Sequence, residues 1–351
     1  MNDSAAASAA DSSLISVIAP CRNERNTLLT FCDSLAAQRL PAGHRLEVLI
    51  ADGCSDDGTR PLLQQRCAED RRFVCIDNPQ RIVSTGLNRA LAQARGALVV
   101  RMDLHTVYAD DYLAECARAL SDSCATCVGG AWQPVASTGR AGAIARAFSS
   151  RFGSGGAASR RLDFNGWVDT VYLGAWWRDE LRRLGGFDET LVRNQDDELN
   201  LRIVRGGGRV WQSAAIRSWY TPRSSFTALF RQFWQYGYWK VPVIRKHRLP
   251  ASPRQLAPFA LVALCAVLAG GALWWPALWA WLGGVVALYA VAAMGSASIA
   301  ARPWREPLVW CGVGWAYACM HFGYGLGFAA GLWNFLVVRR APGVAATGLT
   351  R

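Results

Sequence analysis

The chain has 351 residues, a formal net charge of +12 and 52% hydrophobic residues. This length exceeds one ordinary domain and suits one large domain with an appendage. A positive balance is compatible with nucleic acid, acidic phospholipid or a phosphorylated substrate, but no nucleic-acid-binding module is present, so we expect no nucleic-acid partner.

Residues 1–13 lack the basic and apolar regions of a signal peptide and are expected to form a disordered tail. The next hundred residues alternate short apolar runs with helical patterns. This alternation predicts an α/β fold with a mostly parallel, helix-covered sheet, in which ligands bind beyond the carboxyl ends of the strands. The predicted strands are 15–19, 47–51, 73–76 and 97–102, and polar clusters follow three of them at 21–24, 52–57 and 103–105.

Residues 130–215 carry weaker patterns. The glycines at 153–156 predict a loop, and those at 185–188 a turn. Residues 196–204 predict a helix with acidic residues in its first turn, where the helix dipole favours negative charge. We therefore expect the domain that begins at residue 14 to extend to about residue 225.

The C-terminal part has the composition of a membrane region. Residues 226–254 mix aromatic side chains with Arg and Lys, which predicts an amphipathic segment at a membrane interface. No charged residue lies between Arg254 and Arg302 or between Glu306 and Arg339. Residues 255–340 therefore predict about three transmembrane helices, followed by a tail at 341–351. A buried soluble bundle is the alternative, which the adjacent Trp274 and Trp275 disfavour.

The orientation of the spans follows only in part from charge. Basic residues before the first span, and Arg302 and Arg305 after the second, predict that both ends of that hairpin face the cytoplasm. Arg339 and Arg340 would then face outward, against the rule. His321 in the third span is a candidate functional group or the donor of a helix–helix hydrogen bond.

Asp103 and His105 stand at alternate positions just after a strand, so both side chains can face one point. A carboxylate and an imidazole can hold a divalent ion that also binds a diphosphate. The alternative is a surface Asp and a helix-capping His. Asp52, at another strand end, can accept hydrogen bonds from a base or ribose, whereas Asp56 and Asp57 are more typical of helix caps.

Taken together, five segments resemble glycosyltransferase family 2, and in particular its succinoglycan-type membrane glucosyltransferase branch. The resemblance covers residues 14–245 and implies a GT-A fold, a nucleotide-sugar donor of the UDP-glucose kind, Mg²⁺ or Mn²⁺, and inversion at the anomeric carbon. The segments are SVIAPCRNE at 16–24, VLIADGCSDDGT at 48–59, RMDLHT at 101–106, GGFDE at 185–189 and NQDDEL at 194–199.

The resemblance also implies roles for single residues at the donor site. Asp103 matches the first acid of the family's DxD motif, whereas His105 replaces the usual second acid. Because imidazole suits Mn²⁺ better than Mg²⁺, this departure leaves the preferred metal open. The residues expected to line the nucleotide pocket are Pro20, Arg22, Asn23 and Glu24, with Asp52 contacting the base.

The same resemblance implies roles for residues on the acceptor side of the site. Asp196 matches the acid expected to act as general base, although Gln195 stands where Glu is common, and Asp197 is the neighbour most easily confused with it. Residues 231–240 resemble, imperfectly, the Gln-x-x-Arg-Trp segment of processive relatives, and an interfacial helix is the alternative. This segment and Asp197 supply the acceptor or diphosphate candidates, namely Asp197, Arg231, Gln232, Trp239 and Lys240.

The hypothesis is an inverting glycosyltransferase that moves a glucose-type sugar from a UDP-sugar to a polyprenyl-diphosphate-linked glycan. The protein is expected to be a multi-pass protein of the cytoplasmic membrane, in contact with its lipid, with its catalytic domain in the cytoplasm and a role in exopolysaccharide or cell-surface glycan assembly. The alternatives are transfer to polyprenyl phosphate and a non-catalytic membrane subunit that binds nucleotide-sugar. The sequence leaves the linkage and the oligomeric state open.

Overall fold

The computed structural model describes residues 10–135, 138–302 and 305–348. The chain divides into two compact units. The first unit is Met1–Gln133 with Arg161–Tyr220, and the second is Pro134–Arg160 with Thr221–Arg351. Of the predicted tail at 1–13, residues 1–9 lie outside the described residues, and the first strand already begins at Asp11.

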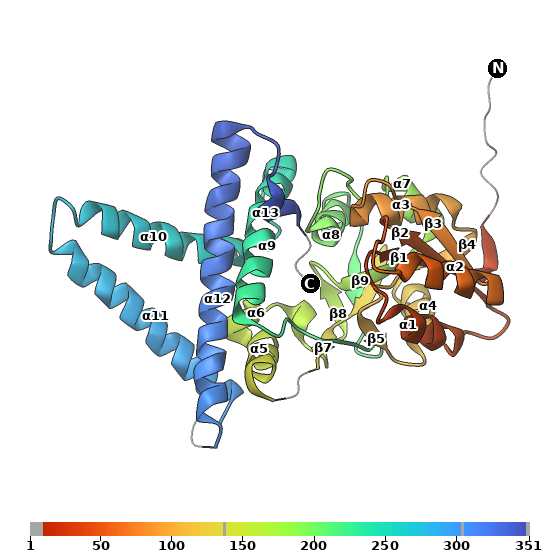
Figure 1. Ribbon diagram of the computed structural model, residues 1–351, viewed down its shortest axis with the longest axis horizontal. Helices are drawn as coiled ribbons and strands as arrows, with labels where there is room; N and C mark the ends of the chain where they lie inside the picture. Colours follow the sequence, from red (N-terminus) through yellow and green to blue (C-terminus); the bar gives the residue numbers. More distant parts are fainter. Residues whose placement is uncertain (1–9, 136–137, 303–304, 349–351) are drawn as a thin grey trace. The chain divides into compact units, whose positions relative to one another are not determined.

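The first unit is built on a twisted sheet with helices between its strands (Figure 1). Within the described residues this sheet has eight strands in the order β3-β2-β1-β4-β9-β6-β10-β8, and a small sheet has the order β5-β11-β7. The strands are β1 (Asp11–Cys21), β2 (Arg45–Asp52), β3 (Phe73–Asp77), β4 (Gly96–Arg101), β5 (Thr106–Tyr108), β6 (Cys127–Gly130), β7 (Trp132–Pro134), β8 (Gly166–Val168), β9 (Tyr172–Trp177), β10 (Val210–Gln212) and β11 (Ser218–Tyr220). The helices are α1 (Leu28–Ala36), α2 (Thr59–Glu69), α3 (Val83–Gln93), α4 (Tyr112–Ser123), α7 (Arg178–Arg183) and α8 (Gln195–Arg205).

The central strands are apolar on both sides because each face of the sheet has its own core. Along β1, Ile15 and Val17 belong to one core and Ile18 to the other, as the two-residue period of a strand requires. The helix α1 buries Leu28, Phe31, Cys32 and Leu35, which lie on one face at helical spacing. Burying both faces fixes the register of β1, since a slip by one residue would exchange the two sets of side chains.

The predicted α/β fold with a mostly parallel sheet is confirmed. Strands β3, β2, β1 and β4 are joined by parallel pairing, and β10 is parallel to β6. The pairs that β9 makes with β4 and β6, and the pair of β10 with β8, are antiparallel. The four N-terminal strands therefore have their carboxyl ends at one edge.

The second unit is helical within the described residues. Its short helices are α6 (Arg151–Ser154), η1 (Ala158–Arg160), η2 (Pro253–Leu256), the π-helix η3 (Trp333–Val338) and α13 (Val344–Thr347), and its longer ones are α5 (Gly139–Ser149), α9 (Phe226–His247), α10 (Ala257–Gly271), α11 (Leu278–Ala300) and α12 (Pro307–Leu332). Helices α10 and α11 meet in a hairpin turn that contains the exposed Trp274 and Trp275 (Figure 1).

Helices α9 and α12 approach at backbone distance. A Cβ atom at Gly327 would lie 1.9 Å from the carbonyl oxygen of Trp234, and one at Gly237 would lie 2.0 Å from that of Tyr324. The corresponding distances are 2.8 Å from Gly323 to the carbonyl oxygen of Phe230 and 2.7 Å from Gly331 to that of Tyr238. Small residues at this spacing let two helices approach closely. The aromatic segment 226–247 is therefore a packed helix, with Gln232, Gln235 and Lys240 buried.

The predicted domain boundary at residue 225 stays a prediction, whereas residues 134–160, expected within the first domain, belong to the helical unit. Arg146 of α5 forms an ion pair with Glu306, which precedes α12. His321 of α12 lies 3.2 Å from the carbonyl oxygen of Phe152 through Nε2, and its Nδ1 lies 3.0 Å from the hydroxyl oxygen of Tyr289 on α11. His321 thus forms the expected helix–helix hydrogen bond.

Two helices among the described residues are long and apolar enough to cross a membrane. They are Pro253–Gly271, with a mean hydropathy of 1.5, and Leu278–Ala300, with 1.8. No part of the most apolar stretch of the first, and only 11% of that of the second, is buried, which is unlike the core helix of a soluble protein. The third predicted span corresponds to α12 and stays a prediction.

Candidate active site

The three predicted polar clusters meet at the carboxyl edge of the sheet. Strand β1 lies between β2 and β4, and both neighbours are parallel to it. Cys21 at the end of β1 pairs in register with Asp52 at the end of β2. Beyond β4, the amide of Met102 donates a hydrogen bond to the carbonyl oxygen of Ile18 at 3.1 Å. The residues after these strands therefore share one edge.

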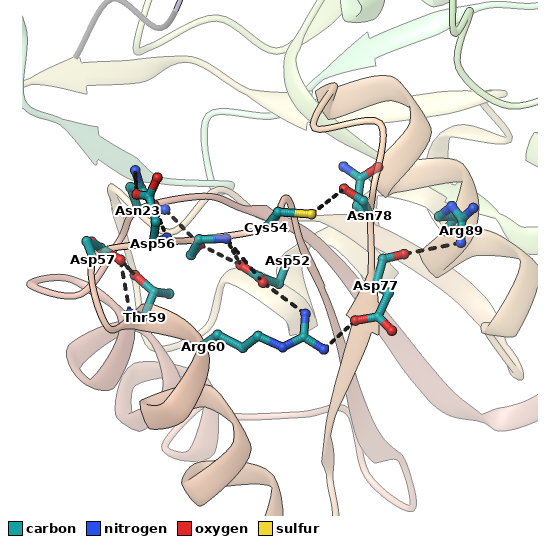
Figure 2. Close-up of polar contacts among 11 residues, drawn as sticks. Asn23, Asp52, Cys54, Asp56, Asp57, Thr59, Arg60, Asp77, Asn78 and Arg89 are labelled. Atoms are coloured by element: carbon teal, nitrogen blue, oxygen red, sulfur yellow. Dashed lines mark hydrogen bonds and ion pairs between the residues drawn. The ribbon is translucent and has the colours of Figure 1, made fainter.

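The loop after β1 is hydrogen-bonded to the loop after β2 (Figure 2). The backbone amide of Asn23 donates to Ser55 Oγ at 2.9 Å, and its side-chain amide donates to Asp56 Oδ1 at 2.9 Å. The amide of Glu24 donates to Thr59 Oγ1 at 2.8 Å. These bonds fix the left-handed conformation of Asn23, whose φ is 56°. Asn tolerates that conformation better than most residues do.

Asp57 stabilises the start of α2, although the N-cap position itself is Gly58 rather than the predicted Asp57. Its Oδ1 accepts hydrogen bonds from the amide of Thr59 at 3.0 Å and from the Thr59 hydroxyl at 2.6 Å, at the start of α2. Burial raises the pKa of Asp57, but the hydrogen bonds from Thr59 and the amide of Arg25 outweigh it, so the pKa lies below its ordinary value.

Asp52 is fully buried and holds the first turn of its own loop (Figure 2). Its Oδ1 accepts from Ser55 Oγ at 2.5 Å, and its Oδ2 lies 3.2 Å from Arg60 Nη1. The same guanidinium reaches Asp77 Oδ1 at 2.5 Å. The structure thus shows Asp52 as an anchor between two strand ends, and its contact with a base stays a prediction.

Asp103 is held on both sides by protein groups. Arg101 Nε lies 3.2 Å from Asp103 Oδ1 and Arg101 Nη2 lies 3.2 Å from Oδ2, a bidentate pair. The Tyr108 hydroxyl accepts from the amide of Asp103 at 2.6 Å and donates to its carbonyl oxygen at 3.1 Å. The side chain of Arg101 is 5% exposed and that of Asp103 is 13% exposed. The carboxylate therefore has one orientation and a nearby cation.

His105 faces the loop after β1. Its Nδ1 lies 3.5 Å from Glu24 Oε1, and its ring contacts that of Tyr220 edge to face. His105 Nδ1 is buried and forms no hydrogen bond in the described structure. The pair thus joins two polar clusters, because Glu24 follows β1 and His105 follows β4.

These residues fit the divalent ion that the resemblance implies. A histidine ligand commonly donates its second ring nitrogen to a carboxylate, as His105 is placed to do toward Glu24. No cluster of three or more His, Cys, Asp or Glu suited to a metal exists among the described residues. Mg²⁺ is usually bound by one or two carboxylates together with substrate phosphates, so two protein ligands such as Asp103 and His105 would be compatible with such an ion, and their role stays a prediction.

Asp196 lies in the first turn of α8, where the helix dipole favours its charge. Its Oδ1 accepts a hydrogen bond from the amide of Asp197 at 3.0 Å. Burial lowers the pKa of Arg101, but Asp103 and Asp196 raise it by more, so it lies above its ordinary value. Asp196 thus lies within electrostatic range of the cation that pairs with Asp103, although it follows it by more than ninety positions.

The predicted acceptor residues of α9 lie in the second unit. Trp239 is buried, and its indole N–H donates to the carbonyl oxygen of Ala346 at 2.8 Å. Gln232 donates from Nε2 to the Tyr236 hydroxyl at 2.9 Å, and Lys240 is 5% exposed. Arg231 is exposed. Their roles at an acceptor site stay predictions.

Sequence reasoning missed Arg101, Tyr108 and the contact of Glu24 with His105. Arg101 carried a signal, since an arginine at the end of a buried apolar strand needs an ionic partner. Tyr108 carried none, because its hydroxyl reaches Asp103 only through the fold of the intervening turn.

A cavity of about 690 Å³ lies at the opposite, amino end of β1 and β2. Arg45, Glu47 and Arg72 are among its lining residues, and the predicted site residues are not. This cavity is therefore not the candidate site. The candidate site is identified by the polar side chains that converge at the carboxyl edge of the sheet.

Comparison with known proteins gives a consistent result. Residues 16–174 match the family described as glycosyl transferase family 2. Over 260 residues the chain is 34% identical to the succinoglycan biosynthesis protein ExoA of Rhizobium meliloti (strain 1021), covering 72% of this chain and 77% of that protein.

Two solved structures share the fold. The mannosyltransferase PcManGT from Pyrobaculum calidifontis, in complex with GDP-Man and Mn²⁺, matches with a TM-score of 0.60 and 21% identity, over 91% of this chain and 87% of that chain. TarS from S. aureus matches with a TM-score of 0.50 and 14% identity, over 90% of this chain and 55% of that chain. At such identities the likeness supports the fold alone.

Proposed function

Because the chain belongs to glycosyltransferase family 2, we propose that it moves a glucose-type sugar from a UDP-sugar to a polyprenyl-diphosphate-linked glycan. The likeness to a succinoglycan biosynthesis protein supports a place in exopolysaccharide biosynthesis. The observation that carries the proposal is that the polar residues after β1, β2 and β4 meet at one edge of the sheet, where Arg101 holds Asp103 in a bidentate pair.

In the proposed reaction Asp196 is the general base. It takes the proton of the acceptor hydroxyl as that oxygen bonds to the anomeric carbon of the donor. The bond from this carbon to the diphosphate oxygen breaks, and its electron pair leaves with the nucleoside diphosphate. A single displacement of this kind inverts the anomeric carbon. Positioned general bases contribute about 10²–10⁴-fold to rate.

Asp103 and His105 are the residues proposed to hold a divalent ion, which would neutralise charge on the diphosphate when bound. Asp103 has a fixed orientation because Arg101 pairs with its carboxylate and the Tyr108 hydroxyl bonds its backbone amide. Glu24, beside His105 Nδ1, leaves Nε2 as the nitrogen available to a ligand.

The membrane part of the proposal is supported by α10 and α11. Both are apolar along their length, and large side chains such as Val267 of α10 and Leu288 of α11 are each 71% exposed. Apolar surface of this extent is stable in lipid rather than in water. Two such helices suit an acceptor carried on a lipid, with the catalytic domain at the cytoplasmic face.

A donor screen tests this function. The full chain, purified in detergent, is incubated with Mn²⁺, a panel of UDP- and GDP-sugars, and either polyprenyl-diphosphate-linked glycan or polyprenyl phosphate. We expect sugar transfer from a UDP-hexose to the diphosphate-linked acceptor, and none in Asp103→Ala. Transfer to polyprenyl phosphate alone would replace the acceptor assignment. Nucleotide-sugar binding without transfer would instead favour a non-catalytic subunit.

A further inference from the structure

Arg101 is an unusual residue for its position. It ends β4, a strand whose preceding residues Leu98, Val99 and Val100 are buried and apolar. Arginine is rarely buried to this degree unless it is paired. Its Nε and Nη2 pair with Asp103, but Nη1 is buried and forms no hydrogen bond in the described structure. A buried donor without a partner destabilises a fold, so its retention calls for a functional reason.

The positive charge of Arg101 gives a functional reason for its buried position. Asp103, proposed to hold a metal, pairs with Arg101, and Asp196, proposed as the base, helps to raise the pKa of the same guanidinium. Two carboxylates repel the diphosphate of a nucleotide-sugar, and a guanidinium in a poorly hydrated position offsets part of this repulsion. Because Arg101 is already fixed, it offsets this repulsion without the loss of side-chain entropy that ordering a flexible arginine would cost.

We propose that Arg101 is a positioning residue of the nucleotide-sugar site, whose fixed charge offsets Asp103 and Asp196 so that a diphosphate can bind beside them. The inference rests on the proposed function, since it assumes a nucleotide-sugar donor. It assigns to Arg101 two tasks, which are to orient the Asp103 carboxylate through the bidentate pair and to lower the negative potential at the diphosphate.

Nucleotide binding separates these tasks from a purely structural one. In the full-length protein with Mn²⁺, UDP binding is measured by calorimetry and uridine binding by ligand-detected NMR. We expect Arg101→Met to weaken UDP binding about tenfold or more, while uridine binding changes less than about twofold, because only UDP carries the diphosphate. Arg101→Lys keeps the charge and should recover most of the UDP affinity.

A second variant is expected to strengthen UDP binding instead of weakening it. In EDTA, Asp103→Asn should bind UDP about threefold or more tightly than the wild type, because Arg101 is then no longer offset by Asp103. If Asp103 acted only through a metal, the two proteins would bind UDP equally in EDTA, and the inference would be wrong.

The remaining outcomes are distinct. Equal losses of UDP and uridine binding in Arg101→Met would show a structural role and overturn the inference, as would unchanged UDP binding. If the wild type bound neither UDP nor GDP, the proposed function itself would fail and the inference with it. The uridine signal also reports that the base pocket of each variant is folded.

Discussion

The side chains of Arg101 and Asp103 meet in a bidentate pair, with Nε 3.2 Å from Oδ1 and Nη2 3.2 Å from Oδ2. Each partner is largely removed from water. Removing one partner of such a pair leaves the other buried without compensation, which costs more than the net strength of the pair.

A double-mutant cycle on this pair should therefore show strong coupling. We expect Arg101→Met and Asp103→Asn each to lower the free energy of unfolding by about 3 kcal/mol. The double variant should lose less than the sum by about 1 kcal/mol or more. Chemical denaturation of the full chain in detergent measures all four proteins, and additive losses would contradict the coupling.

Asp196→Asn should separate chemistry from binding. The amide cannot accept the acceptor proton, so we expect kcat to fall about 10²–10⁴-fold while the KM for donor changes little. The matched comparison is Asp197→Asn, which alters the next residue of the same helix turn, an acceptor candidate, and should lower kcat much less than Asp196→Asn does. If Asp197→Asn were the inactive variant, the assignment of the base would move to Asp197.

The preferred metal should depend on residue 105. Imidazole suits Mn²⁺, whereas carboxylate oxygen suits Mg²⁺, so we expect His105→Asp to lower the ratio of Mn²⁺- to Mg²⁺-supported activity several-fold. Because Glu24 Oε1 lies 3.5 Å from His105 Nδ1, a new carboxylate there would meet a second one. The double variant with Glu24→Gln removes this repulsion and is the sharper test. An unchanged ratio would exclude His105 as a ligand.

Glu47 should make the first unit acid-sensitive. It is buried and accepts from Ser16 Oγ at 2.6 Å, and from the amide and Nε of Arg95 at 2.7 and 2.8 Å. Burial raises the pKa of Glu47, but these bonds lower it by more, so it lies below the ordinary value of 4.5. Its stabilisation is thus complete above that value and is lost as pH falls through the lower, folded-state pKa.

We therefore expect Glu47→Gln to lower the free energy of unfolding by about 2 kcal/mol at neutral pH. The difference from the wild type should shrink as the pH falls below about 4.5. The control is Glu69→Gln, on an exposed helix end, which should change stability by less than about 0.5 kcal/mol. Thermal unfolding across this pH range measures both, and a difference independent of pH would contradict the argument.

The contact of α9 with α12 should tolerate no side chain at Gly327. A methyl group there would meet the Trp234 carbonyl oxygen, so we expect Gly327→Ala to destabilise the protein by about 2 kcal/mol. Gly295 of α11 has open space where its Cβ would lie, so Gly295→Ala is the matched control and should be neutral or slightly stabilising. A thermal shift in detergent compares them, and equal effects would contradict close packing.

Much of the first unit follows from local sequence. Apolar runs and helical patterns place β1 to β4, and parallel pairing then brings residues 21–24, 52–57 and 103–105 to one edge. A structural role of Asp57 at the start of α2 also follows, because its partner Thr59 is two residues away. Local spacing suffices wherever the partner is near in sequence.

The rest depends on contacts between distant segments. Residues 134–160 belong to the helical unit, where Arg146 pairs with Glu306, 160 positions later, and no local pattern indicates that partner. The contact of His105 with Glu24 likewise exists only once β1 and β4 are paired. The role proposed for Arg101 depends on its Nη1, which is buried and forms no hydrogen bond in the described structure. No sequence pattern indicates this.

The spacing of the glycines on α12 has a mechanical consequence. Gly323, Gly327 and Gly331 repeat every four residues and face carbonyl oxygens of α9 with the same repeat, those of Phe230, Trp234 and Tyr238. A slide of one helix along the other by four residues, about 6 Å at 1.5 Å per residue, would bring two of the three glycines opposite carbonyl oxygens again. Smaller displacements would place α9 carbonyl oxygens against the larger side chains between these glycines, so the glycine repeat fixes the register of the two helices. The hydrogen bond from Asn334 to the Tyr238 hydroxyl, at 2.6 Å, is a further contact of the same register.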